Sequence, residues 1–137
     1  MASNHSMKLG EVAIGNNYSL IRIIVHKKGM DYLPYTAGCL VEGPKGGIYL
    51  LDTFGYEQLV KSIKAKLIAV NAGSVGTAVM NDIENMRNMS YQAVIVNNKA
   101  LLSGNTNEEC CKAYAKAYGF KFIKRKDVPK FIEKVNS

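Results

Sequence analysis

Three short runs of apolar residues, each ending at a polar residue that leads toward a helical pattern, constrain the fold of this chain most strongly. The runs are IYLL, LIAV and AVIV, at residues 48–51, 67–70 and 93–96, and they end at Asp52, Asn71 and Asn97. Continuous apolar strands covered by helices are typical of parallel α/β sheets. We therefore expect parallel strands at these runs, the last of them spanning residues 91–96, reached by right-handed crossovers.

The N-terminal part predicts antiparallel strands instead. Residues 18–28 are dense in β-branched residues, which favours a strand. Residues 39–42 and 48–51 are two apolar runs joined by Gly43, Pro44, Lys45, Gly46 and Gly47, a typical β-hairpin connection. The predicted fold class is α/β: a single domain with a mixed sheet, N-terminal antiparallel strands, C-terminal parallel βαβ units and helices on both faces.

Apolar residues at three-to-four spacing predict helices at residues 54–66 and 75–88. Thr106 and Glu109 form a capping-box pattern that begins a helix ending at Gly119. A last strand at residues 120–123 and a terminal helix beginning near Asp127 complete the pattern. Residues 97–104 fit either a short hairpin or a loop, and the sequence does not decide between them.

The chain has 137 residues, 47% of them apolar, which suits one domain. We interpret residues 1–6 as an expression remnant and residues 7–137 as the domain. The sequence has no run of 18 apolar residues and no signal-peptide pattern near its start, so we expect a cytoplasmic protein without a membrane partner. Nothing in the sequence predicts its oligomeric state.

Cysteine and histidine usage disfavours several classes of site. Cys39, Cys110 and Cys111 form no CxxC pair, and the only histidines are His5 and His26. We therefore expect reduced thiols and no metal site. No motif identifies a reaction or a cofactor, so the sequence leaves open whether the protein is an enzyme.

The segment at residues 71–77, here called the 71–77 turn, is the first candidate site. As a strand-to-helix turn, its two glycines would let the backbone approach an anion, and its hydroxyls would add donors. It matches neither GxGxxG nor the P-loop, and a plain connection with Ser74 as N-cap is the alternative. We predict a phosphate-bearing small molecule here, with a nucleotide as first candidate. The predicted ligand-binding residues are Asp52, Asn71, Gly73, Ser74, Gly76, Thr77, Asn97 and Asn98.

For Asp52, the alternative to ligand binding is that its side chain caps the helix that follows. In an α/β sheet, ligands bind beyond the carboxyl ends of the strands. We therefore expect Asp52, Asn71 and the pair Asn97 and Asn98 to meet at one edge of the sheet.

The C-terminal segment carries most of the positive charge. Residues 112–137 hold eight Lys or Arg residues against two acidic residues, so this segment contributes +6 to the net charge of +7. A surface of this kind attracts polyanions. The alternative function is therefore a non-catalytic nucleic-acid or protein-interaction module using residues 112–134, although a merely solvated lysine-rich surface also fits. The nucleic-acid-binding residues of this alternative are Lys121, Lys124, Arg125, Lys126 and Lys130.

Overall fold

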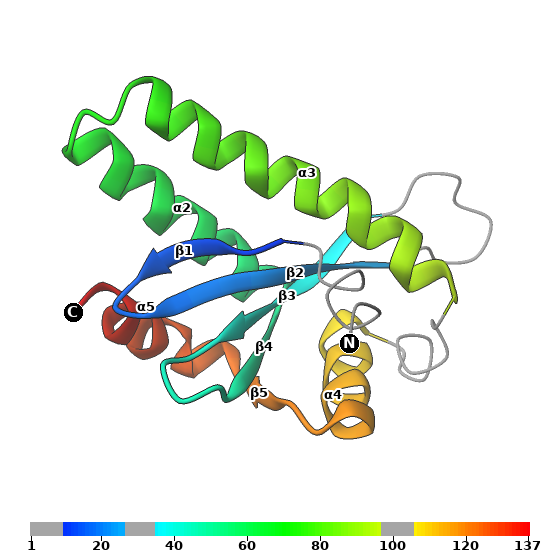
Figure 1. Cartoon of the computed structure of the whole chain (residues 1–137). Helices are drawn as coiled ribbons and strands as arrows, with labels where there is room; N and C mark the ends of the chain where they lie inside the picture. The colour runs from blue at the N-terminus through cyan, green and yellow to red at the C-terminus, as the bar shows by residue number, and fades with distance from the viewer. Residues whose placement is uncertain (1–9, 27–34, 97–105) are drawn as a thin grey trace.

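The computed structural model describes residues 10–26, 35–96 and 106–137, and its centre is a five-stranded sheet (Figure 1). The strands lie in chain order across the sheet. The first four pair with one another in antiparallel fashion, and the last is parallel to the fourth. They are β1 (Val12–Gly15), β2 (Tyr18–His26), β3 (Tyr35–Glu42), β4 (Ile48–Asp52) and β5 (Lys121–Ile123).

Helices connect the two parallel strands and close the chain. The helical elements are α2 (Thr53–Ala69), α3 (Ser74–Val96), α4 (Asn107–Tyr118), the 3-10 helix η1 (Arg125–Asp127) and α5 (Val128–Asn136). The chain passes from β4 through α2, α3 and α4 before it returns to the sheet as β5 (Figure 1). The predicted fold class, an α/β domain with a mixed sheet, is confirmed.

The sheet is covered on both faces, because the central strands bury side chains in alternation. Leu51 points to the face on which α2, α3 and α5 pack, in a cluster with Leu59 and Ile83. Leu50 points to the opposite face and packs with Cys111 of α4. Such near-continuous apolar strands are what a sheet between two helical layers requires.

The predicted strand at residues 67–70 is wrong, because these residues form the C-terminal turn of α2 and its cap. No glycine or proline interrupts the chain from residue 57 to residue 72, so the helix continues. Ile68 and Val70 are 79% and 71% exposed, so this apolar run is not a core strand. The helix ends where Asn71 and Gly73 adopt left-handed φ angles of 52° and 58°.

The predicted strand at residues 91–96 is also wrong, because α3 extends to Val96. After Gly76 no helix-breaking residue occurs before residue 97, and short apolar runs fit a buried helix as well as a strand. Among the described residues, β4 and β5 are therefore the parallel pair. The choice between a hairpin and a loop for residues 97–104 falls outside the described residues.

The local signals for α4 are confirmed. The Thr106 hydroxyl accepts a hydrogen bond from the Glu109 amide at 3.1 Å, and the Glu109 carboxylate accepts one from the Thr106 amide at 3.0 Å. Gly119 ends the helix with a φ of 76°. These contacts satisfy backbone groups that a helix end otherwise leaves unpaired.

Candidate functional site

The predicted ligand-binding residues do not converge on one edge of the sheet. Asp52 precedes the first residue of α2, and Asn71 follows the last turn of the same helix. A 17-residue helix is about 25 Å long, so the two residues lie at opposite ends of it. Asn97 and Asn98 fall outside the described residues. The expected meeting of Asp52 and Asn71 is wrong, because the segment between them is one helix.

The 71–77 turn joins two helices, so it is not a strand-to-helix turn. Ser74, proposed as an N-cap, is instead the first residue of α3 and is exposed. Gly76 is buried, and a Cβ added there would lie 3.3 Å from the Ala72 Cβ and 3.6 Å from the Leu67 Cβ. The absence of a side chain at Gly76 therefore lets α3 begin close to the end of α2.

Several donors of this turn already have partners. The Val75 amide donates to the Ala72 carbonyl oxygen, and the Thr77 amide donates to the Gly73 carbonyl oxygen, both at 3.1 Å. The Thr77 hydroxyl also donates to the Gly73 carbonyl oxygen, at 3.4 Å. These groups already donate hydrogen bonds within the turn, so they are less available to donate hydrogen bonds to a bound phosphate.

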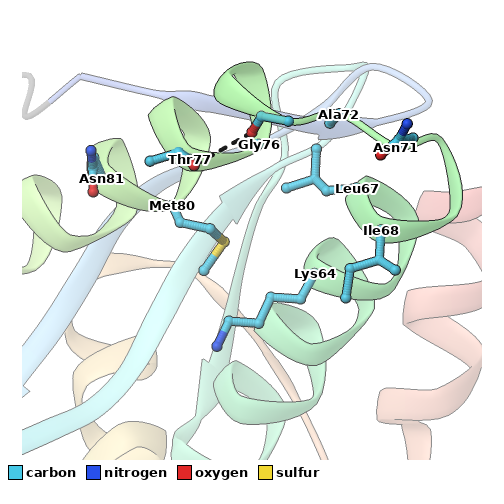
Figure 2. Close-up of a pocket in the computed structure, with 10 residues that line it drawn as sticks. Lys64, Leu67, Ile68, Asn71, Ala72, Gly76, Thr77, Met80 and Asn81 are labelled. Carbon is cyan, nitrogen blue, oxygen red and sulfur yellow. Dashed lines mark hydrogen bonds between the residues drawn. The ribbon is translucent and has the colours of Figure 1, made fainter.

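A pocket of about 450 Å³ nevertheless lies beside the turn, between α2 and α3 (Figure 2). Leu67 of α2 and Met80 of α3 form part of its apolar wall. It fits a small molecule with an apolar part and an anionic or hydrogen-bonding group. Its polar side chains are Lys64, Asn71, Thr77 and Asn81.

Asp52 is fully buried, and both of its carboxylate oxygens are engaged. Oδ1 accepts a hydrogen bond from the Gly55 amide at 3.2 Å, so the side chain caps α2. Oδ2 accepts one from Arg125 Nε at 2.7 Å. The Arg125 side chain is 51% exposed and lies over the Phe54 ring, 5.9 Å from its centroid. This hydrogen bond and the charge of Asp52 raise the pKa of Arg125. Helix capping, the alternative for Asp52, is confirmed.

Two buried thiols, Cys39 of β3 and Cys111 of α4, interact electrostatically with Asp52. Burial raises the pKa of Cys111 to about 12, with the charge of Asp52 adding to the effect. Burial also raises the pKa of Cys39, and the nearby Cys111 adds to it. The Cys111 thiol donates to the Ala37 carbonyl oxygen at 3.4 Å. Neither thiol supplies a thiolate nucleophile at neutral pH, since a reactive cysteine needs a lowered pKa and access.

A second hollow, here called the lysine groove, lies between β5 and α5. Its volume is about 280 Å³. Aromatic and aliphatic side chains from β2, β4, β5 and α5 meet there with three lysines from β5 and α5. The lining residues are Tyr18, Tyr49, Lys121, Phe122, Ile123, Asp127, Lys130, Phe131 and Lys134.

The lysines of this groove are not neutralised within the described part of the chain. Lys121, Lys130 and Lys134 are exposed, and none of them forms an ion pair with another described residue. The groove contains one acidic side chain, that of Asp127. The lysine groove is therefore a local excess of positive charge beside apolar and aromatic walls.

Of the five nucleic-acid-binding residues predicted from the sequence, the groove includes two. Lys121 and Lys130 line it, whereas Lys124 and Lys126 are exposed at the end of β5 and in η1. Arg125 is held by Asp52 instead.

Sequence reasoning missed Tyr18, Tyr49 and Lys134 as members of the groove. The sequence could have identified Lys134 as a groove residue, because it follows Lys130 by four residues and so lies on the same helix face. The sequence could not have identified Tyr49, since only the pairing of β4 with β5 places it beside Lys121.

No helix within the ranges that the structure describes is long and apolar enough to cross a membrane. The same residues hold no cluster of three or more His, Cys, Asp or Glu side chains suited to a metal ion.

Comparison of the chain with protein-family models, with curated proteins and with solved structures gave no match.

Proposed function

We propose that this protein binds nucleic acid through the lysine groove. The observation that carries the proposal is the convergence of Lys121 from β5 with Lys130 and Lys134 from α5 around one hollow. A phosphate backbone offers negative charges at regular spacing, and lysines contact it by displacing its condensed counterions. The aromatic walls suit the apolar faces of nucleotides.

The distribution of charge supports the same proposal. Residues 112–137 hold +6 of the chain's net charge of +7, and seven of the nine residues that line the groove belong to this segment. An excess of one sign of charge raises the rate and the affinity of encounter with a polyanion. A solvated lysine surface without function would not require lysines from two elements to share one hollow.

The test is the salt dependence of oligonucleotide binding. A fluorescently labelled single-stranded oligonucleotide is titrated with the protein at several salt concentrations, and log Kd is plotted against log salt. Each phosphate contact contributes about 0.7 to the slope for a single strand. Lys130→Ala with Lys134→Ala should therefore reduce the slope by about 1.4 and weaken binding at low salt.

The matched control removes the same charge elsewhere. Lys61→Ala with Lys116→Ala takes two exposed lysines from α2 and α4, outside the groove. This variant should keep nearly the parental slope. Equal loss in both double variants would mean that binding follows net charge alone and would overturn the proposal.

A small-molecule function at the pocket between α2 and α3 is the second candidate. Its supporting observation is that Lys64, Asn71 and Thr77 all line one pocket of about 450 Å³. ATP, GTP and inorganic phosphate are the probes, and a ligand at a hundredfold excess over Kd should stabilise the fold by about 2.7 kcal/mol. Lys64→Ala should remove the resulting melting shift. If no probe raises the melting temperature of the parent, this candidate is rejected.

A further inference from the structure

The lysine groove is lined by aromatic side chains as well as by lysines, and the aromatic side chains differ in how much of their surface is exposed. Tyr18 and Phe131 are 6% and 7% exposed, so their rings belong mainly to the core. Tyr49 is only partly buried and packs against both of them. Its ring centroid lies 6.4 Å from that of Tyr18 and 5.3 Å from that of Phe131. Tyr49 is therefore the tyrosine of the groove that retains surface for a ligand.

The ring of Tyr49 is held in place before any ligand arrives. The Phe131 ring meets it at an interplanar angle of 57°, and Tyr18 meets it at 43°. Gly43 of the β3–β4 connection also lies against it, since a Cβ added at Gly43 would be 3.0 Å from Tyr49 Cε2. A ring fixed on several sides costs little conformational entropy when a ligand stacks on it.

We propose that the lysine groove receives an unpaired base of a single-stranded nucleic acid, which stacks on Tyr49 while lysines contact the flanking phosphates. The proposal rests on the proposed nucleic-acid binding and names its substrate class. At about 280 Å³ the groove is near the lower limit of about 300 Å³ for ligand pockets, so it suits one small flat ring system. In a duplex the bases are stacked inside and cannot enter such a groove.

The position of Asp127 agrees with a base, and not a phosphate, inside the groove. Asp127 is one of the residues that line the groove, and its negative charge would repel a phosphate placed there. A base offers N–H donors that a carboxylate accepts. The surrounding lysine amines then remain available for the backbone on either side of the inserted base. Every base has an aromatic face, so this mode predicts weak sequence preference.

The first measurement compares affinities for a single strand and for the duplex of the same sequence. The parent should bind the single strand more tightly. Tyr49→Leu, which keeps an apolar side chain but removes the ring, should weaken single-strand binding by about 5- to 150-fold, the range of one base–aromatic stack. Duplex binding should stay nearly unchanged, and Tyr49→Phe should retain the preference for the single strand.

The second measurement reads stacking directly and does not depend on the stability of Tyr49→Leu. The chain contains no tryptophan, so Tyr49→Trp supplies a single indole emitter at the site. Adding the single-stranded oligonucleotide should quench its fluorescence, whereas the duplex should quench it much less. Thermal melting of each variant shows whether the fold is kept.

The outcomes separate the two proposals. Equal binding of single strand and duplex, lowered by Lys130→Ala with Lys134→Ala and without quenching in Tyr49→Trp, would overturn base insertion and leave nucleic-acid binding standing. Absence of binding to either oligonucleotide would overturn both. A single-strand preference that is lost in Tyr49→Leu, with quenching in Tyr49→Trp, supports both.

Discussion

Arg125→Ala should destabilise the fold far more than its half-exposed position suggests. The substitution leaves the fully buried Asp52 carboxylate without its 2.7 Å partner. Removing one member of a buried ion pair costs about 3–5 kcal/mol, because the other charge stays buried and uncompensated. Arg125 is 51% exposed and Asp52 keeps its bond to the Gly55 amide, so we expect a smaller loss, about 2–3 kcal/mol.

Urea unfolding followed by far-ultraviolet circular dichroism measures this loss. The control is Lys126→Ala, the neighbouring exposed cation, which should cost under about 0.5 kcal/mol. Adding Asp52→Asn to Arg125→Ala should recover about 1 kcal/mol, because asparagine caps a helix about as well as aspartate and carries no charge. If Arg125→Ala matches Lys126→Ala within error, the ion pair has no structural role and the reasoning is refuted.

Three further outcomes follow from burial and backbone geometry. Ile83→Ala should cost about 2–4 kcal/mol, because this core side chain is 3% exposed, and a loss no larger than that of an exposed lysine would invert our assignment of the α3 faces. Gly73→Ala should cost about 1–2 kcal/mol from its φ of +58° alone, since an added Cβ meets no atom within 4 Å; an unchanged urea midpoint would contradict this. Burial raises the pKa of Cys111 from 9.0 to about 12. The unfolded chain therefore loses a thiol proton that the folded chain keeps, and the free energy of unfolding should fall as pH rises through that window. Cys111→Ala should flatten this fall in pH-dependent urea melts, and an unaltered slope would speak against a buried thiol.

Local signals in the sequence predicted those parts of the fold that depend on neighbours in the chain. Ile83 and Met86 lie in the helix predicted at residues 75–88 from apolar residues at three-to-four spacing, and both are buried. The capping box of Thr106 and Glu109 depends on residues three apart, so it could be found without knowledge of the rest of the fold.

The errors at residues 67–70 and 91–96 have one physical origin. A run of four apolar residues indicates burial but does not distinguish a strand from part of a helix. At Ile68 it does not even indicate burial, because this side chain near the end of α2 is exposed. The nucleotide hypothesis depended on a strand before the 71–77 turn, so its sheet-edge geometry failed with that strand.

Neither the Asp52–Arg125 ion pair nor the lysine groove could be predicted from the sequence, because distant segments build each of them. Arg125 and Asp52 are 73 positions apart in the chain, and their contact requires β5 to lie beside β4. The same pairing brings Tyr49 next to Lys121. The sequence displays the excess of lysines, whereas the hollow that three of them share exists only once the parallel strand is in place.

Lysine acetylation footprinting tests the central claim most directly, since it locates bound nucleic acid on the chain without any amino-acid substitution. The protein is acetylated briefly with and without a saturating single-stranded oligonucleotide, and mass spectrometry compares the extent of modification at each lysine. We predict protection of Lys121, Lys130 and Lys134, with Lys61 and Lys116 modified equally in both samples. Protection spread evenly over all five lysines, or none at the three lysines of the groove, would contradict the claim that the lysine groove binds nucleic acid.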